Sequence, residues 1–284
     1  MENNQKNALR PGTLYLVATP IGNLEDISYR AVRTLTEADL IAAEDTRRTA
    51  TLLNHLDIKT PLTSYFQHNE KSKGEYIVKK LREGLAVALV SDAGTPAISD
   101  PGEDLVRLCA AEGIPVVPVP GAVAGISGLI SSGLSTGRFA FEGFLSVNKK
   151  SRREHLAEIK NDKRTLIFYE APHKLIYPLK DMLEAFGDRR ISVVRELTKI
   201  HEEVKRTTLK EAVSFYTENN PKGEFVLVLE GAKEDLSLKE YTLEDAVELA
   251  KEKIEEGFSA SDAAKFAAAE SKIKKGDIYR ELNR

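Results

Sequence analysis

Short apolar runs alternate with helical segments through the first half of the chain, and this alternation constrains the fold more than any other feature. The runs are short, rich in β-prone side chains and bounded by turn residues, so they predict buried strands at 13–18, 40–43, 85–90 and 116–119. Apolar residues at helical spacing lie between them and predict helices at 28–38, 46–56, 69–83, 100–113 and 122–132, with Asp100 as an N-cap. Such alternation is typical of a mostly parallel sheet covered by helices.

The second half of the chain groups its strand signals more closely, which favours a mixed sheet. After Gly231 the composition shifts to Ala, Glu and Lys, with helical spacing and no strand signal. We therefore expect an α/β protein with an N-terminal α/β domain (1–122), a second α/β domain (123–235) and a C-terminal helical segment (236–284). The expected strands are 139–145, 165–169, 191–195, 201–207 and 225–230, and the expected helices are 150–160, 174–186, 209–219, 242–257, 259–271 and 275–283.

Composition excludes some classes of protein. The 284 residues include 41 Lys and Arg against 44 Asp and Glu, a net charge of −3 that argues against holding naked nucleic acid by bulk charge. The lone cysteine, Cys109, lies in an apolar helical stretch and is expected to be a buried structural thiol. The longest uncharged run, 114–137, is broken by prolines and glycines, and the polar N-terminus has no signal-peptide core. We expect a cytoplasmic protein without a membrane segment.

Common catalytic motifs are absent from the sequence. The first strand is followed by Ala18-Thr19-Pro20-Ile21-Gly22-Asn23, which is not a dinucleotide-binding fingerprint. There is neither a G-x-x-x-x-G-K-[ST] loop nor a G-x-S-x-G elbow. The five histidines lack the spacing of helix-borne zinc ligands, so no metal site is predicted.

Three loops that follow predicted strands combine glycine with proline, at 19–24, 91–102 and 119–122. Glycine lets a ligand approach the backbone, proline stiffens the loop, and open α/β sheets bind ligands at the carboxyl ends of their strands. The loops therefore predict a site for a small polar ligand such as a nucleoside, the alternative being ordinary strand-to-helix turns. Polar clusters at 44–47, 168–173 and 195–203 also follow strands, and each is equally explained by helix caps and surface ion pairs.

Seven segments in one order resemble the tetrapyrrole methylase superfamily, and within it the small-subunit ribosomal RNA methyltransferase I group. They are LYLVATPIGNLEDIS, AEDTRRT, SDAGTPAISDPG, PVPGA, FYEAPHK, RELTKIHEEV and KGEFVLVLEG. The resemblance implies two α/β domains with a cleft for S-adenosylmethionine between them, and a homodimer. It also implies methylation of a cytidine ribose 2′-hydroxyl in the decoding region of 16S ribosomal RNA, with the small ribosomal subunit as partner.

Carried over residue by residue, the resemblance implies a set of donor-binding positions in the loops and in the second domain. They are Pro20, Ile21, Gly22, Asp92, Gly94, Thr95, Pro96, Ile98, Gly121, Ala122, Val123, Ala124, Phe168 and Tyr169.

A base that takes the hydroxyl proton would assist methyl transfer, although alignment of the two reactants alone can suffice. The candidates, unranked, are Asp26, Asp45, Asp100, Glu170, Glu196 and His201. Basic residues suited to RNA phosphates are Arg30, Arg47, Arg195 and Lys199, each of which can equally pair with a neighbouring acid. The basic run with Lys149, Lys150, Arg152 and Arg153 is a further candidate, the alternative being a solvated helix start. The C-terminal helices are a further RNA contact or a dimer element.

Two other functions compete with this interpretation. One is a methyltransferase of the same fold acting on a tetrapyrrole or another small molecule, and the other is a non-catalytic ribosome-assembly factor.

Overall fold

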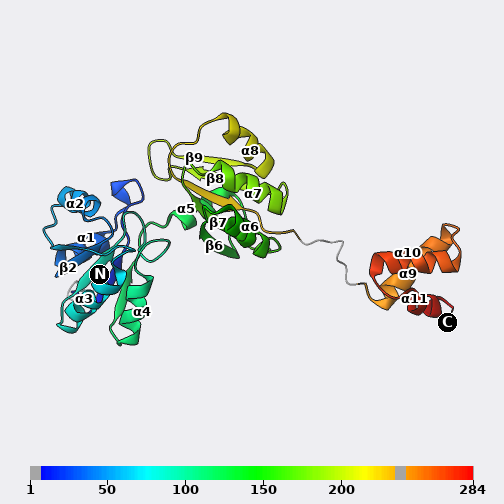
Figure 1. Ribbon diagram of the computed structural model, residues 1–284, viewed down its shortest axis with the longest axis horizontal. Helices are drawn as coiled ribbons and strands as arrows, with labels where there is room; N and C mark the ends of the chain where they lie inside the picture. Colours follow the sequence, from blue (N-terminus) through cyan, green and yellow to red (C-terminus); the bar gives the residue numbers. More distant parts are fainter. Residues whose placement is uncertain (1–7, 234–240, 284) are drawn as a thin grey trace, which may run out of the picture. The chain divides into compact units, whose positions relative to one another are not determined.

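The computed structural model describes residues 8–233 and 241–283. The chain forms two compact units, Met1–Ala232 and Lys233–Arg284, and each is described by itself (Figure 1). The first unit holds two five-stranded sheets, and the second is helical. The predicted α/β class with a C-terminal helical part is therefore confirmed.

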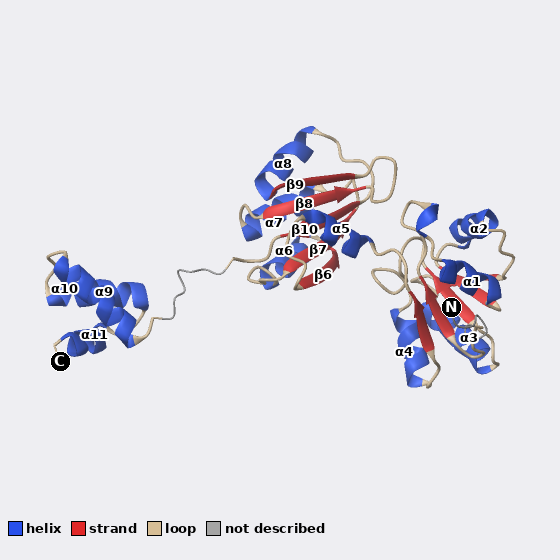
Figure 2. Cartoon of the chain, turned by 180° about the vertical axis from the view of Figure 1, so that it is seen from behind, coloured by secondary structure: helices blue, strands red, loops and turns tan. Residues whose placement is uncertain are grey.

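The first sheet has the strand order β3-β2-β4-β1-β5, and all its strand pairs are parallel. Figure 2 shows strands in red and helices in blue. Parallel neighbours need crossover connections, which the helices between the strands supply. The strands are β1 (Leu14–Val17), β2 (Leu40–Ala43), β3 (Leu62–Ser64), β4 (Val87–Val90) and β5 (Val116–Val119), and the helices are α1 (Tyr29–Glu37), α2 (Thr46–His55), α3 (Glu70–Arg82) and α4 (Glu103–Ala111), with a short 3-10 helix η2 (Leu24–Asp26).

Two details of this sheet differ from the sequence predictions. The edge strand β3 was not predicted, because three half-buried residues are too few to form an apolar run. The N-cap predicted at Asp100 is wrong: α4 begins at Glu103, and Gly102 precedes it with a φ of 140°. A Cβ at Gly102 would lie 2.9 Å from Leu89 Cδ2, so the loop folds against β4 before the helix begins.

The second sheet has the order β6-β7-β10-β8-β9, with β6 and β7 parallel and the other pairs antiparallel, which confirms a mixed sheet. Its helix α5 packs against β10 and β8, where a Cβ at Gly128 would lie 2.8 Å from Val226 Cγ1. The glycine thus permits the close approach. The elements are β6 (Phe139–Phe144), β7 (Thr165–Glu170), β8 (Arg190–Arg195), β9 (Glu203–Thr208), β10 (Phe225–Leu229), α5 (Ala124–Ser132), α6 (Lys149–Glu158), α7 (Ile176–Phe186) and α8 (Leu209–Glu218).

Cys109 has no exposed surface and packs in a core with Leu105, Leu14 and Leu89. Burial raises the pKa of its thiol to about 11, so it carries no thiolate near neutral pH. The prediction of a structural cysteine is confirmed.

The C-terminal unit consists of α9 (Leu243–Glu255), α10 (Ala260–Ser271) and α11 (Lys275–Leu282). Alanines 263, 264 and 267 of α10 are fully buried, and such small side chains allow close helix packing. The domain boundaries at 122 and 235 stay a prediction. In the described parts of the chain, no helix is both long and apolar enough to span a membrane.

Candidate functional site

A cavity of about 260 Å³ lies between the carboxyl ends of the strands of the first sheet and one end of the strands of the second sheet. The first sheet contributes Ile21 and residues 93–95 and 98–100 from the loops after β1 and β4. Val123 and Ala124, at the start of α5, form another wall. The second sheet contributes strand-end residues of β6, β7, β8 and β10. Such a crevice at strand ends is where open α/β sheets bind ligands.

The three glycine and proline loops come together at this cavity. The backbones of Thr19 and Gly94 exchange hydrogen bonds of 2.8 and 3.1 Å. Thr95 Oγ1 donates a hydrogen bond of 3.1 Å to the carbonyl oxygen of Ala122. Gly94 adopts a φ of 80°, and a Cβ there would lie 3.2 Å from Ile21 Cγ2. Glycine at this position therefore keeps the cavity wall open.

The structure brings half of the predicted donor-binding residues into the cavity wall: Ile21, Gly94, Thr95, Ile98, Val123, Ala124 and Tyr169. Six others lie in the same loops but outside the wall: Pro20, Gly22, Asp92, Pro96, Gly121 and Ala122. Phe168 packs in the core on the other face of the second sheet, because neighbouring residues of a strand point to opposite faces.

Two of the six candidate bases, Asp100 and Glu170, line the cavity. Burial and, to a smaller extent, the negative charges of Glu44 and Asp92 together raise the pKa of Asp100 to about 7, against a hydrogen bond from Ser91 that lowers it. Burial also raises the pKa of Glu170, against a 2.8 Å hydrogen bond that its Oε1 accepts from the N–H of Ala171. Both carboxyls therefore take up protons more readily than a solvated acid does.

The other four candidate bases lie outside the cavity wall. Asp45 caps α2 and forms hydrogen bonds with the side chain and backbone of Arg47, which lower the pKa of its carboxyl to about 2. Glu196 binds Lys199, whose Nζ lies 2.9 Å from its Oε1. Asp26 in η2 and His201 in the loop before β9 are exposed.

Arg152, a candidate RNA contact, is buried and stabilises the fold instead. Its Nη2 lies 2.6 Å from Asp181 Oδ2, and its Nη1 donates to the carbonyl oxygens of Ser146 and Val147. All these partners are internal, so the guanidinium is not free for a phosphate. The Arg152 side chain therefore connects the loop after β6, at Ser146 and Val147, to Asp181 of α7.

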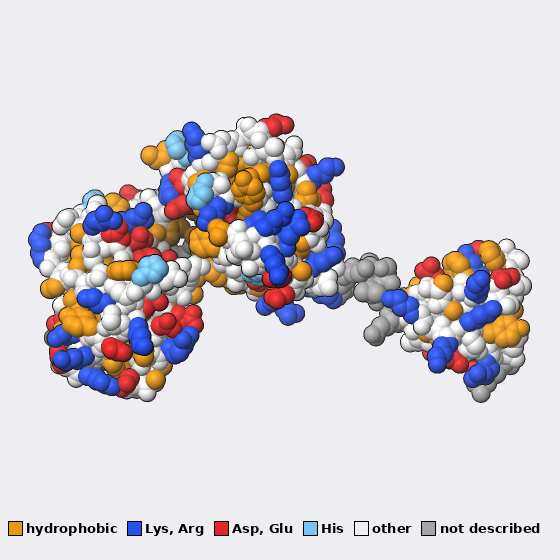
Figure 3. Space-filling view, viewed as in Figure 1, with side chains coloured by type: hydrophobic (Ala, Val, Ile, Leu, Met, Phe, Trp, Pro, Cys, Tyr) orange, Lys and Arg blue, Asp and Glu red, His pale blue; other side chains and the backbone are white. Residues whose placement is uncertain are grey.

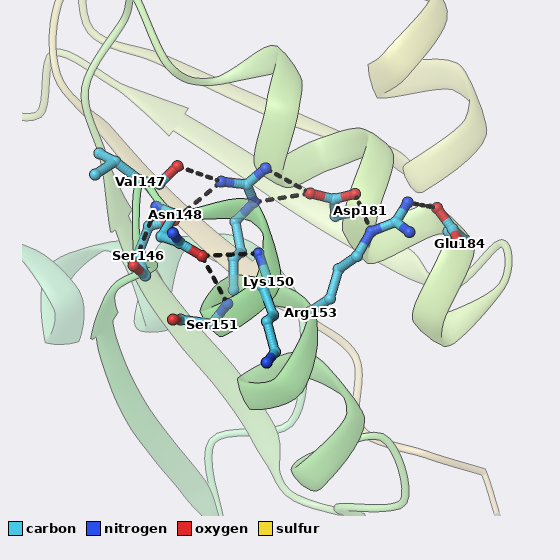
Figure 4. Close-up of polar contacts among 9 residues, drawn as sticks. Ser146, Val147, Asn148, Lys150, Ser151, Arg153, Asp181 and Glu184 are labelled. Atoms are coloured by element: carbon cyan, nitrogen blue, oxygen red, sulfur yellow. Dashed lines mark hydrogen bonds and ion pairs between the residues drawn. The ribbon is translucent and has the colours of Figure 1, made fainter.

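The neighbours of Arg152 on α6 are exposed. Lys149, Lys150 and Arg153 line a shallow surface hollow. Arg153 pairs with Asp181 and Glu184, whereas Lys150 points away from that pair of acids (Figure 4). Lysine and arginine side chains gather over this region in Figure 3.

The remaining predicted cations have partners within the fold. Lys199 Nζ also lies 2.9 Å from Glu224 Oε2. A Cβ at Gly22 would lie only 2.5 Å from Cγ of Lys199, so the lysine packs closely against the glycine. Arg195 lies 3.3 Å from Glu203, and Arg47 lies 3.0 Å from Asp45. Arg30 is considered below.

Sequence reasoning missed Phe144 and Glu224, which also line the cavity. Phe144 is the last residue of β6, and it is 57% exposed. Its position at the carboxyl end of a predicted strand could have indicated that it faces the ligand. Glu224 precedes β10, which runs antiparallel to β7 and β8. The start of β10 therefore lies beside the carboxyl ends of its two neighbours. A search restricted to the carboxyl ends of strands does not find Glu224.

The family model of Tetrapyrrole (Corrin/Porphyrin) Methylases matches residues 13–213. The chain belongs to the tetrapyrrole methylase family. This tetrapyrrole methylase is 53% identical over 270 residues to a ribosomal RNA small subunit methyltransferase I of Halalkalibacterium halodurans, covering 94% of this chain and 93% of the relative. It is 45% identical to the protein of the same name from Bacillus subtilis, again over 94% and 93%. The chain therefore also belongs to the small-subunit ribosomal RNA methyltransferase I group.

Solved structures agree with the fold of this tetrapyrrole methylase. Uroporphyrin-III C-methyl transferase from Thermus thermophilus, complexed with S-adenyl homocysteine, matches with a TM-score of 0.54 at 19% identity, covering 77% of this chain and 97% of that one. A diphthine synthase matches with a TM-score of 0.58 at 14% identity, covering 77% and 90%.

Proposed function

We propose that this protein uses S-adenosylmethionine to methylate the ribose 2′-hydroxyl of a cytidine in the decoding region of 16S ribosomal RNA, in the cytoplasm. The observation that carries the proposal is identity of 45–53% to ribosomal RNA small subunit methyltransferases I along nearly the whole chain. The cavity supports it, since seven of its wall residues are positions that the family resemblance implied for the donor.

The cavity suits the chemistry of this donor. Val194, Leu197 and Val226 offer apolar walls for a flat base, and Phe144 and Tyr169 offer aromatic rings. A sulfonium cation is attracted by aromatic faces and by carboxylates such as those of Asp100 and Glu170. When bound, the cofactor supplies an activated methyl group and its own leaving group.

The protein aligns the ribose hydroxyl and accepts its proton. Asp100 is suited to accepting the proton because its carboxyl lines the cavity and has a pKa of about 7, which suits a general base near neutral pH. Asp100 would accept the O–H proton of the ribose hydroxyl as that oxygen is methylated, with the bound donor supplying the methyl group and its own leaving group.

The exposed cations Lys149, Lys150 and Arg153 are proposed to touch RNA phosphates, and Arg152 is withdrawn from that set because it is buried. With a net charge of −3, bulk attraction for RNA is weak, so local patches must dock a shaped substrate such as the small subunit.

A homodimer through β6 and α5 completes the proposal. β6 is an edge strand, and its Phe139 and Phe141 are 39% and 37% exposed. Ile130 of α5 is 71% exposed. An exposed apolar edge strand is prone to pair with another chain unless it is covered, and a second copy would cover it. Sedimentation of wild type and of Ile130→Asp tests this. We expect a dimer that the variant weakens, and a monomeric wild type would contradict it.

One methylation assay tests the activity. The purified protein and tritiated S-adenosylmethionine are offered free 16S RNA, small subunits from a strain that lacks the protein, and a tetrapyrrole precursor. We expect label on a cytidine ribose in the subunits. Label in the tetrapyrrole alone would support the small-molecule alternative, and no label in any sample would support the non-catalytic alternative.

A further inference from the structure

A second hollow of about 220 Å³ lies against α1 and β5 of the first sheet and gathers three arginines. Arg30 and Arg33 reach it from α1, and Arg10 reaches it from the segment before β1. Val117 and Val119 of β5 form its apolar side. None of these residues lines the cavity described above.

The positive charge of this arginine pocket is poorly balanced. In the parts of the chain that the structure describes, Arg10 and Arg30 have no carboxylate within 4.0 Å, and Arg33 Nε lies 4.0 Å from Glu37 Oε1. By contrast, Arg107 on α4 binds Glu103 at 2.6 Å and Asp104 at 2.7 Å. The pocket therefore presents cations that an anion from outside can neutralise.

One guanidinium group is already oriented, and another has a buried donor without an acceptor among the described residues. Arg30 Nη2 donates a hydrogen bond of 3.0 Å to the carbonyl oxygen of Pro118, which holds its side chain across β5. Arg33 Nε is buried and has no hydrogen-bond acceptor among the described residues. A buried donor without an acceptor is costly, and an oxygen-rich ligand would supply the missing acceptor. Guanidinium groups match phosphate oxygens in geometry and in charge.

The pocket also lies near the cavity and beside an exposed ring. Val119 lines the pocket and Val123 lines the cavity, and they are four positions apart in the chain, a span of at most about 14 Å. Tyr29, next to Arg30 at the start of α1, is 97% exposed. Exposed aromatic rings beside cations are how proteins stack unpaired bases while holding the backbone.

We propose that the pocket formed by Arg10, Arg30 and Arg33 binds a backbone phosphate of the RNA substrate, with Tyr29 stacking on a neighbouring base. The inference rests on the proposed function for the identity of the ligand. It adds to that function a place where the strand is held outside the cavity.

Binding of a fluorescent single-stranded RNA with the decoding-region sequence, measured by anisotropy at several salt concentrations, tests the inference. For the triple variant R10Q/R30Q/R33Q we expect an affinity about tenfold lower at 0.1 M salt. The slope of log K against log salt should also fall by about 0.7, the value for one phosphate on a single strand. Tyr29→Ala should weaken binding about fivefold or more, and Tyr29→Phe should restore it.

Arg107→Gln is the matched control, since it removes an exposed arginine whose charge Glu103 and Asp104 already balance. It should leave both affinity and slope unchanged. Calorimetry of S-adenosylmethionine binding should be the same for wild type and the triple variant, because the pocket is separate from the cavity. The single variant Arg10→Gln removes a side chain with no ion pair in the described chain, so it tests the pocket even if the triple variant folds poorly.

Unchanged RNA affinity and slope in Arg10→Gln and in the triple variant would overturn the inference while leaving methylation by wild type intact. If instead the variants lose RNA affinity but wild type methylates no RNA, the pocket stands and the proposed reaction falls.

Discussion

The phenol oxygen of Tyr169 accepts a 2.8 Å hydrogen bond from the backbone N–H of Gly125. This contact joins the end of β7 to the first turn of α5, directly beside Val123 and Ala124 in the cavity wall. The first N–H groups of a helix have no partner within the helix, so the tyrosine satisfies one of them. It thereby sets where α5 begins at the cavity.

Tyr169→Phe should therefore weaken donor binding. Loss of the hydroxyl leaves the Gly125 N–H without its acceptor at a cost of about 1 kcal/mol, which corresponds to about fivefold in the dissociation constant. Calorimetry with S-adenosylmethionine measures the change. Tyr177→Phe, at a tyrosine that is 61% exposed outside the cavity, is the control and should bind like wild type. Equal affinities for both variants would contradict a positioning role for Tyr169.

All strands except β3, the helices and the convergence of three loops could be predicted from the sequence because they depend on local pattern. Short β-prone runs and glycine–proline turns identify strand ends, and the parallel order then brings those ends to one edge. Thr19, Gly94 and Thr95 meet there as this logic requires. The resemblance to a family added the chemical identity of the ligand, which pattern alone does not supply.

Other features depend on tertiary packing and could not be predicted from the sequence. Arg152 and Arg153 are neighbours in one basic run and both pair with Asp181 on α7, yet Arg152 is buried and Arg153 is exposed, a difference that depends on how α6 packs against α7. Arg10 precedes β1 and Arg30 follows it on α1, and the two meet at the pocket because α1 packs beside β1. Side-chain environment, not residue type, separates these cations.

Asp181→Ala should destabilise the fold strongly. The side chains of Arg152 and Asp181 are 8% and 7% exposed, so the variant leaves a buried guanidinium without its carboxylate. Loss of one partner of a buried pair costs about 3 kcal/mol or more in the free energy of unfolding. Urea unfolding followed by circular dichroism measures it. Asp57→Asn, which removes the charge of the exposed pair with Lys59 at a position with a φ of 54° that asparagine tolerates, should cost less than about 1 kcal/mol, and equal losses would contradict the prediction.

Gly94→Trp should abolish donor binding. Gly94 and Gly84 both have positive φ, of 80° and 93°, so a tryptophan strains the backbone at either position. A Cβ at Gly94 would lie 3.2 Å from Ile21 in the cavity wall, whereas one at Gly84 meets nothing within 4 Å. Only Gly94→Trp should lose binding in calorimetry, while thermal melting should show similar destabilisation in both. Retained binding in Gly94→Trp would mean that the donor site lies elsewhere.

The ionisation of Asp100 should make the protein less stable as the pH rises. Its carboxyl has a pKa of about 7 in the fold against 3.8 ordinarily, mainly because of burial. Between pH of about 4 and 7 the folded chain keeps a proton that the unfolded chain has released, so the free energy of unfolding falls through this window. Asp100→Asn cannot ionise. Its melting temperature should exceed that of wild type at pH 8, and the difference should vanish near pH 4.

The same ionisation should make the protein more active, because only the carboxylate can accept the hydroxyl proton. The methyl-transfer rate of wild type should rise with pH up to about 7 and then level off, and Asp100→Asn should lower it by about 10²-fold or more and remove that rise. Glu103→Gln, at a mostly exposed acid on α4, is the control and should keep the wild-type profile. A profile for Asp100→Asn that still rises through pH 7 would assign the proton to another group. The active carboxylate is thus the less stable form of the fold, as expected where stability is traded for chemistry.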